Sequence, residues 1–365
     1  MRGCIAGGQA KLGSYWKSRR RLLVWVLPFL LLACAGLSGL DKESQQGHPA
    51  HHVEGGFRNP DSAITRPGGL VRAKYVAGRL WANLIATRNV SLPREANDGQ
   101  ALRYNNPVAT VTWVGHSTLL VQLDGVNLLT DPHWGKRAGP ISWVGARRLN
   151  APGLRFEDLP QIHLVLISHD HYDHLDLGTV KRLAETHDPL FLVPLGLREW
   201  FAENGMAHVK ELDWWQEYEH RGLRLVCVPA QHFSGRNLSD TNRRLWASWV
   251  VSGRSKRLYA GGDSGYFDGF KQIGEALGPF DLAAVPIGAY KPGYMMKSVH
   301  TTPEEAVRAF EDLHGKALLG IHWGTFDLAE EPPDEPPWRM QKEAERRKID
   351  FWRVWVLKQG ETRRW

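Results

Sequence analysis

The run from His169 to His174 holds the side chains of this sequence that are best suited to chemistry. It reads His-Asp-His-Tyr-Asp-His, so that three imidazoles and two carboxylates fall within six residues. Imidazole nitrogens with a minority of carboxylate oxygens favour zinc, and iron or manganese also suit such a mixed set of ligands. The alternative is a solvated loop that is rich in His and Asp, but this density of donors makes that interpretation much the weaker one.

A buried strand is expected immediately before this run. Residues 164–168 are short, apolar and rich in β-branched side chains, which predicts a strand that opens into a loop at His169. On extended backbone His169 and His171 point the same way, because side chains alternate between the two faces of a strand. Asp173 and His174 follow one turn later and can be aimed at a second point nearby. The spacing therefore indicates two adjacent metal ions.

The motif resembles the His-x-His-x-Asp-His signature of the metallo-β-lactamase-fold hydrolases. That family has three further ligands downstream, and each has a counterpart at the end of a short apolar run, namely His232, Asp263 and His322. The resemblance implies a set of seven metal ligands: His169, His171, Asp173, His174, His232, Asp263 and His322. It also implies two Zn²⁺ ions, with Asp263 as the ligand that bridges them.

The resemblance divides the remaining ligands between the two ions. One ion is expected to bind His169, His171 and His232. The other is expected to bind Asp173, His174 and His322.

Longer phrases resemble a narrower family, N-acyl-phosphatidylethanolamine-hydrolysing phospholipase D. They run in unbroken order over about residues 105 to 360 and include TWVGHST, ISHDHYDHLD, FLVPLGL, GGDSGYF, GPFDLAAVPIGAY and IHWGTF. The resemblance implies hydrolysis of a phospholipid substrate to phosphatidic acid and an N-acylethanolamine. It further implies substrate contacts by Tyr172 and His300, although Tyr172 could also pack against the sheet.

The same resemblance suggests how the reaction is catalysed. Two ions about 3.5 to 4 Å apart lower the pKa of a shared water towards about 7 and stabilise the oxygens that enter and leave phosphorus. No nucleophilic side chain is required, and the candidate catalytic carboxylates are Asp263 and Asp131. Asp131 matches a position where the family often has a carboxylate that fixes a ligand histidine, but an Asp that forms a turn before Pro132 is an equal alternative. His116 is expected to be a structural histidine, and a role in the site is the alternative.

Two other classes of function remain open at this point. The metal motif alone is compatible with a lactonase, a ribonuclease or a cyclic-nucleotide phosphodiesterase of the same fold, and the long phrases outside the motif argue against these. A non-catalytic surface lipoprotein that keeps the fold as a binding module would be favoured by missing ligands. Each of the seven ligand positions is filled.

The elements around the motif predict a mixed α/β (α+β) domain. Strands are expected at residues 108–114, 117–123 and 126–130, and Asp124-Gly125 between the last two is a strong hairpin signal. Helices are expected at residues 70–86, 177–185 and 303–313, the last with Thr302 as its cap and Pro303 at its first position. The resemblance implies that these elements form a four-layer αββα sandwich.

The chain divides into three parts. Residues 1–33 have the shape of a signal segment, with six basic residues, no acidic residue and then an apolar run. Residues 34–104 are predicted to be a tether and N-terminal extension, in which His48, His51 and His52 belong to a solvated tether. Residues 105–365 are the predicted hydrolase domain.

The segment Leu31-Leu32-Ala33-Cys34 resembles the bacterial lipobox. It implies cleavage before Cys34 and a lipid anchor that holds the domain at the cell envelope, in the periplasm or at the outer membrane. An uncleaved signal anchor over residues 22–40 is the rival interpretation. Both place the hydrolase domain outside the cytoplasm on a membrane surface.

Charge and cysteine content exclude some further classes. Loss of the signal segment lowers the formal charge from +7 to about +1, which removes the main support for binding of nucleic acid. Cys227 lies in an apolar run and is expected to fill the core rather than to act as a nucleophile. Most of the 16 Trp residues, Trp246 and Trp249 among them, are also expected in the core. The sequence leaves the oligomeric state open, a homodimer included.

Overall fold

The computed structural model describes residues 49–61, 67–85, 90, 92–104, 108–141, 143–237 and 239–365. The predicted signal segment, Cys34 and His48 lie outside the described residues. No helix in the described ranges is both long enough and apolar enough to cross a membrane.

A seven-stranded sheet is built from residues 110–212 and the last strand of the chain. Its strands are β3 (Thr110–Gly115), β4 (Thr118–Leu123), β5 (Val126–Thr130), β8 (Leu164–Leu166), β9 (Leu190–Pro194), β10 (Val209–Leu212) and β18 (Thr362–Arg364). They lie in the order β10-β9-β8-β5-β4-β3-β18. Strands β5, β8, β9 and β10 run parallel to one another, so their carboxyl ends meet at one edge of the sheet.

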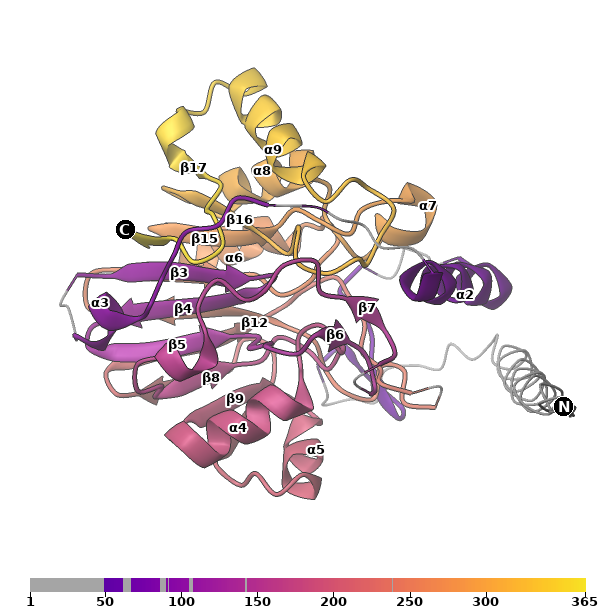
Figure 1. Cartoon of the computed structure of the whole chain (residues 1–365), viewed down its shortest axis with the longest axis horizontal. Helices are drawn as coiled ribbons and strands as arrows, with labels where there is room; N and C mark the ends of the chain where they lie inside the picture. The colour runs from indigo at the N-terminus through magenta and orange to yellow at the C-terminus, as the bar shows by residue number, and fades with distance from the viewer. Residues whose placement is uncertain are drawn as a thin grey trace, which may run out of the picture.

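A second seven-stranded sheet packs face to face on the first (Figure 1). Its strands are β11 (Glu217–His220), β12 (Leu223–Val228), β13 (Ser248–Ser252), β14 (Arg257–Ala260), β15 (Leu282–Pro286), β16 (Leu318–Ile321) and β17 (Val354–Trp355). They lie in sequence order, with β14 to β17 parallel. Every residue of β15 and β16 is buried, as expected for parallel strands covered on both faces.

Helices cover the outer faces of both sheets. Figure 1 shows α4 (Leu177–His187) and α5 (Leu197–Glu203) on one side, with α6 (Gly269–Leu277), α8 (Pro303–Asp312) and α9 (Glu335–Arg346) on the other. The four-layer αββα sandwich is therefore confirmed. The shorter elements are β1 (His52–Val53), β2 (Gly56–Phe57), α3 (Gln100–Arg103), β6 (Arg137–Ala138), β7 (Ala146–Arg147), η2 (Phe156–Asp158), α7 (Gly293–Met296) and η3 (Phe351–Arg353).

Local patterns account for the boundaries of several elements. Asp124 and Gly125 both have positive φ and join β4 to β5 in a tight turn, as the hairpin signal predicts. Thr302 accepts a hydrogen bond from the Glu305 amide, and the Glu305 side chain accepts one from the Thr302 amide, so α8 begins with a capping box. The predicted helix at residues 70–86 is α2 (Gly69–Ile85).

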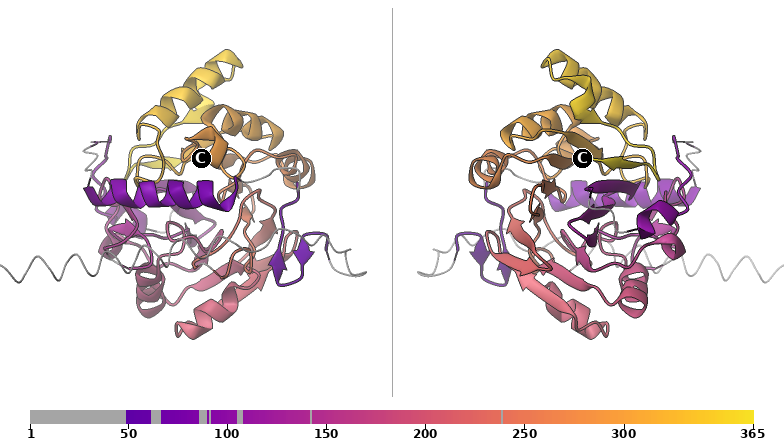
Figure 2. Two further views of the ribbon diagram at one scale, coloured as in Figure 1. Left: turned by 90° about the vertical axis from the view of Figure 1, so that its right-hand side faces the viewer. Right: turned by 90° about the vertical axis from the view of Figure 1, so that its left-hand side faces the viewer.

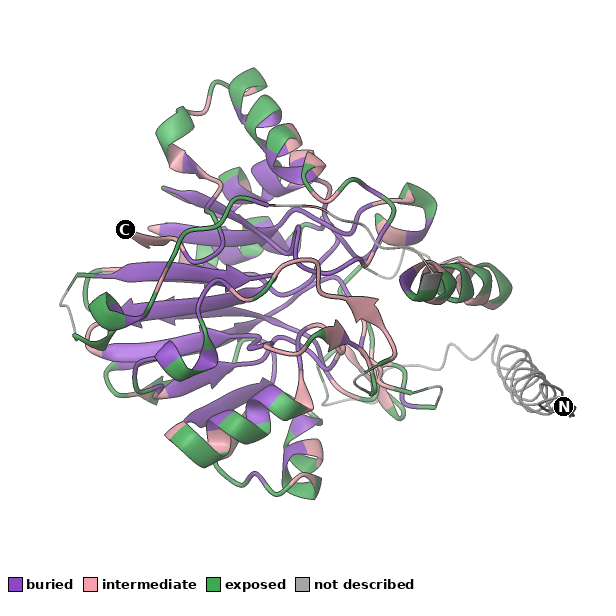
Figure 3. Cartoon of the chain, in the orientation of Figure 1, coloured by how far each residue is buried: buried purple, intermediate pink, exposed green. Residues whose placement is uncertain are grey.

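The main core lies between the two sheets, where the strands are buried almost throughout (Figure 3). Trp246 and Trp249 are 1% and 2% exposed, which confirms their assignment to the core. Cys227 is buried and free, and burial raises the pKa of its thiol well above the usual value. This environment confirms a packing role, because a reactive cysteine needs a lowered pKa.

The N-terminal extension differs from the predicted tether. His51 and His52 each place Nε2 within hydrogen-bond distance of the Asp213 carboxylate, at 2.7 and 2.8 Å. The His51 ring also stacks on Trp214, with 4.3 Å between ring centroids. The interpretation of these two histidines as part of a solvated tether is therefore wrong, because a buried carboxylate far along the chain binds both of them.

Candidate metal centre

The predicted ligands converge at the carboxyl ends of strands from both sheets. His169 follows β8, His232 follows β12, Asp263 follows β14, and His322 directly follows β16. The φ angle of His322 is 60°, a left-handed conformation that side chains other than glycine rarely adopt. Such backbone persists where the surrounding structure determines it, and it is common at functional sites.

A first group of four possible ligands is formed by His169, His171, His232 and Asp263. His171 Nδ1 lies 2.8 Å from His169 Nε2 and 3.1 Å from His232 Nε2. His169 and His232 place Nε2 3.9 and 3.8 Å from Asp263 Oδ2. The chain thus brings the three predicted histidines of the first ion to one point with the predicted bridging carboxylate.

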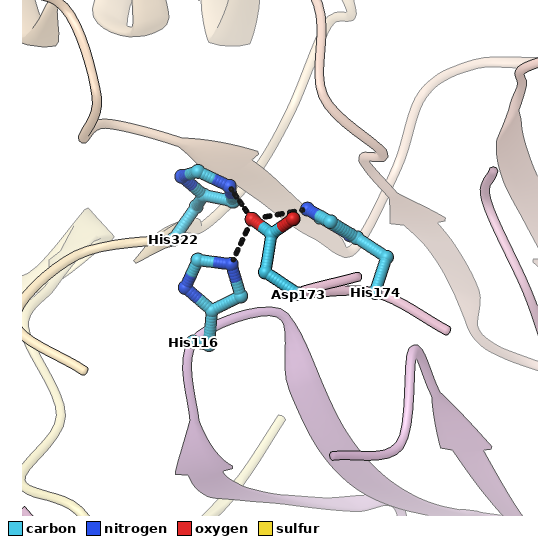
Figure 4. Close-up of side chains that lie close together, drawn as sticks. All are labelled: His116, Asp173, His174 and His322. Atoms are coloured by element: carbon cyan, nitrogen blue, oxygen red, sulfur yellow. Dashed lines mark hydrogen bonds and ion pairs between the residues drawn. The ribbon is translucent and has the colours of Figure 1, made fainter. Parts of the chain in front are cut away.

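A second group is formed by His116, Asp173, His174 and His322 (Figure 4). Asp173 Oδ2 lies 3.0 Å from His116 Nε2, 3.4 Å from His174 Nε2 and 3.5 Å from His322 Nε2. Figure 4 shows the three imidazoles pointing at this carboxylate from different segments of the chain. The three predicted ligands of the second ion are therefore together, and His116 joins them.

Asp263 lies between the two groups. Its Oδ1 is 3.0 Å from His322 Nε2, and its Oδ2 is 3.1 Å from His174 Nε2, while the same carboxylate also faces the histidines of the first group. It is 2% exposed. A carboxylate in this position offers one oxygen to each of two ions, which fits the bridging role that the resemblance implies.

Hydrogen bonds on the far side of the rings orient these histidines. His174 Nδ1 lies 2.7 Å from Asp131 Oδ2, and His232 Nδ1 lies 2.8 Å from the Val299 carbonyl oxygen. When Nδ1–H donates in this way, the other ring nitrogen, Nε2, carries no proton and keeps the lone pair that can bind a metal. Asp131 is 3% exposed and also accepts from the amide and hydroxyl of Ser168, each at 2.7 Å. Asp131 therefore has the contacts predicted for a carboxylate that orients a ligand histidine, here His174.

The electrostatics of the cluster fit bound cations. His174 Nε2, His322 Nε2 and Asp263 Oδ1 are buried and make no hydrogen bond within the described part of the chain. Burial lowers the pKa of His322, but the carboxylates of Asp263 and Asp173 outweigh it and raise the pKa to about 9. Among the described residues no lysine or arginine pairs with Asp173 or Asp263. Buried carboxylates need compensating positive charge, and metal ions at this point would supply it.

The two predicted substrate contacts have different surroundings. His300 is 7% exposed, its Nδ1 lies 3.8 Å from Asp263 Oδ2, and burial lowers the pKa of its imidazole to about 4. The Tyr172 hydroxyl donates to the Arg236 carbonyl oxygen at 2.7 Å, and the Arg236 guanidinium lies over the ring of Tyr172. His300 is therefore part of the cluster, whereas the hydroxyl of Tyr172 already has a partner. The substrate contact of Tyr172 stays a prediction.

Two further histidines lie close to the predicted ligands: His116, which was expected to be structural, and His133, which was not predicted to belong to the site. His116 directly follows the apolar strand β3, which is the same signal that identified the other ligands, and only its isolation from the motif made it look structural. His133 is 1% exposed, and its Nε2 lies 3.1 Å from the Tyr172 carbonyl oxygen, so it supports the loop that carries the motif. Burial and the nearby Arg148 lower the pKa of His133 to about 3.

The N-terminal extension also supports the first group of ligands. The Asn59 side chain donates to the His232 carbonyl oxygen at 2.8 Å and accepts from the His232 amide at 2.9 Å. Nearer the start of the described chain, His51, His52 and Asp213 form a separate group of three possible ligands. Residues 49–61 thus hold the backbone at His232, a predicted metal ligand, through the hydrogen bonds of Asn59.

Comparisons with known proteins agree with this geometry. A family model described as a beta-lactamase superfamily domain matches residues 126–323. Over 228 residues the chain is 45% identical to the N-acyl-phosphatidylethanolamine-hydrolyzing phospholipase D 1 of Caenorhabditis elegans. The aligned region covers 60% of this chain and 64% of that protein. It is 33% identical to the mitochondrial N-acyl-phosphatidylethanolamine-hydrolyzing phospholipase D of Saccharomyces cerevisiae, over 69% of this chain and 54% of that protein. The chain spans less than two thirds of the length of these relatives.

A solved structure supports the fold. A metallo hydrolase from the archaeon Ignicoccus hospitalis superposes with a TM-score of 0.55 at 22% identity. The superposition covers 71% of this chain and 98% of that protein.

Proposed function

The chain belongs to the beta-lactamase superfamily, and from that premise we propose that it is a dinuclear, metal-dependent phosphodiesterase of the phospholipase D type. The observation that carries the proposal is the position of Asp263 between two groups of buried ligands. The similarity to two proteins named for hydrolysis of N-acyl-phosphatidylethanolamine supports the choice of substrate. We infer that zinc is the resident metal, because the donors are mostly imidazole nitrogens.

The candidate ligands divide between the two proposed ions, and neighbouring residues orient the ligand rings. His169, His171 and His232 would hold one ion, and Asp173, His174 and His322 the other, with His116 as a further donor at the second. When bound, the two ions would supply a water of lowered pKa and would stabilise charge on the oxygens of the phosphodiester. The chain keeps the ligand rings in one tautomer through Asp131 and the Val299 carbonyl.

His300 is suited to orient the substrate. Its pKa of about 4 keeps the imidazole neutral at physiological pH, so one ring nitrogen carries a proton and can donate to a phosphoryl oxygen. A neutral ring at this point avoids placing another positive charge beside two cations. Cleavage on the ethanolamine side of the phosphorus would release an N-acylethanolamine and leave phosphatidic acid.

The function is tested with the purified full-length chain in detergent. We expect about two zinc ions per chain, and hydrolysis of N-acyl-phosphatidylethanolamine that is lost with a chelator and restored by added Zn²⁺. Mass spectrometry should find phosphatidic acid and an N-acylethanolamine, with phosphatidylcholine a poorer substrate. Release of diacylglycerol or of free fatty acid would place the cut at another bond. Much faster turnover of a lactone or RNA would move the chain to a different activity.

We also propose that the domain is held at the cell envelope by a lipid on Cys34. The support is the basic and apolar leader that ends in Leu31-Leu32-Ala33-Cys34. Cys34→Ala should abolish metabolic labelling with a fatty acid and leave a larger, unprocessed precursor. Cys4→Ala, a change in the same leader, should preserve both labelling and processing. Labelling that persists in Cys34→Ala, or a mature protein that begins at Met1, would favour the signal anchor instead.

A further inference from the structure

The helix α2 is amphipathic, but its polar face is turned towards the protein. The inward side carries Arg72, Tyr75, Arg79 and Asn83, which recur at the three- and four-residue spacing of one helix face. Arg79 forms an ion pair with Asp327 and also donates to the Asp327 carbonyl oxygen at 2.9 Å. Asn83, 4% exposed, donates to the same carbonyl and accepts from the Arg147 amide at 2.9 Å.

The outward side of α2 is apolar. Leu70, Trp81 and Leu84 are 73%, 60% and 62% exposed, and they lie on the face opposite to Arg79. A helix on the surface of a soluble domain normally buries its apolar stripe and exposes its polar one. The polar anchors on β7 and Asp327 impose the reverse orientation, so the apolar stripe needs a partner outside the domain.

Other exposed apolar side chains come from elements on the same side of the molecule as α2. The loop between β6 and β7 exposes Ile141 and Trp143, at 47% and 67%, and α7 exposes Tyr294 at 67%. Figure 1 places α2, α7 and the β6–β7 hairpin on one side of the molecule, and the left view of Figure 2 shows α2 lying across that side. An exposed apolar surface that is assembled from several elements marks a site of interaction.

This surface adjoins the metal centre. Asp327, which anchors α2, follows His322 by five residues, and both line one cavity together with His116 and Phe326. A partner bound to the outer face of α2 would be separated from this cavity by the helix itself, which is roughly 10 Å across.

Resting on the proposed function, we propose that the outer face of α2, with Trp143 and Tyr294, docks the domain on a phospholipid bilayer that contains anionic lipid. Tryptophan and tyrosine suit the boundary between headgroups and acyl chains. The helix has no acidic residue, and of its three basic residues Lys74 lies on the outer face while Arg72 and Arg79 lie on the inward side.

Lys74 distinguishes a bilayer from a second copy of the chain. In a contact between two α2 helices this ammonium group would lie within an apolar interface, and α2 has no carboxylate to pair with it. On a bilayer the alkyl chain of Lys74 packs among the apolar side chains while the ammonium reaches lipid phosphates. Docking in this way holds the domain on the membrane that contains its proposed substrate.

The test asks whether lipid touches α2 directly. The full-length chain, with Cys4→Ser and Cys34→Ser and with the buried Cys227 unchanged, carries an environment-sensitive fluorophore on Leu84→Cys. The matched control carries it on Trp338→Cys, on α9, where the native side chain is 60% exposed, close to the 62% of Leu84. Both proteins are reconstituted into vesicles of phosphatidylcholine and phosphatidylglycerol that contain a spin-labelled phospholipid.

We expect the lipid spin label to quench the fluorophore at position 84 strongly and the one at position 338 little. Lys74→Glu should reduce the quenching at position 84 severalfold in these vesicles. Absence of lipid quenching at position 84, whether because this face meets water, a second copy or the chain's own leader, would overturn the proposal. Equal quenching at both positions would also overturn it. The readout requires no turnover, so it is independent of whether the chain hydrolyses N-acyl-phosphatidylethanolamine.

Discussion

Replacing His322 with alanine should remove one of two metal ions and lower hydrolysis of N-acyl-phosphatidylethanolamine by at least roughly 100-fold. Even the outer partners of metal ligands cost 10- to 100-fold when they are changed, and His322 is itself a predicted ligand. Its Nε2 lies 3.0 Å from Asp263 Oδ1, so its loss opens the second group of ligands next to the Asp263 carboxylate. Metal analysis of the purified variant and kinetics at saturating Zn²⁺ measure the two effects.

The control for this variant is His208→Ala. The side chain of His208 is 53% exposed, and its nearest acidic partner, Asp188, is 3.7 Å away. This change should leave the metal content at about two ions per chain and the activity unchanged. Circular dichroism of both variants checks that the fold is intact. A folded His322→Ala variant that keeps two ions and full activity would contradict the assignment of His322 as a ligand.

Replacing Asp131 with asparagine should weaken metal binding and activity by roughly 10- to 100-fold while the ligands remain in place. The Asp131 carboxylate accepts from His174 Nδ1 and twice from Ser168, all at 2.7 Å. An asparagine amide nitrogen cannot accept, so at least one of these bonds is lost or His174 changes its tautomer. In the second case the proton moves to Nε2, and the lone pair that faces the metal is removed.

A positioning role for Asp131 makes a specific prediction for rescue. Raising the Zn²⁺ concentration should restore much of the activity of Asp131→Asn, because the ligands themselves are unchanged, whereas it should not rescue His322→Ala. Titration against a competing chelator measures the affinity. Asp268→Asn, at an exposed residue whose side chain makes no capping bond, should behave as the unchanged protein does. Wild-type zinc affinity in a folded Asp131→Asn variant would show that its hydrogen bonds do not tune the metal centre.

Much of the metal centre could be predicted because its signals are local. His169, His171 and Asp173 follow a short apolar strand within a few residues, and that spacing determines which side chains can meet. His232, Asp263 and His322 each end a comparable strand, and the resemblance to a known family joined them to the motif. His116 has the same local signal but lies outside the motif, and it was undervalued for that reason.

The amino-acid sequence by itself determined the strands, the capped helices, the hairpin at Asp124-Gly125 and the types of side chain at the strand ends. These features depend on periodicity and on turn preferences over a few residues, which act before distant parts of the chain meet. The tertiary structure alone decided that His51 and His52 bind Asp213. It also decided the orientation of α2, since a 3.6-residue pattern predicts two faces and not which one turns inward. The physical reason for that orientation is the ion pair between Arg79 and Asp327, 248 residues apart, which exists only once the sheets have brought those segments together.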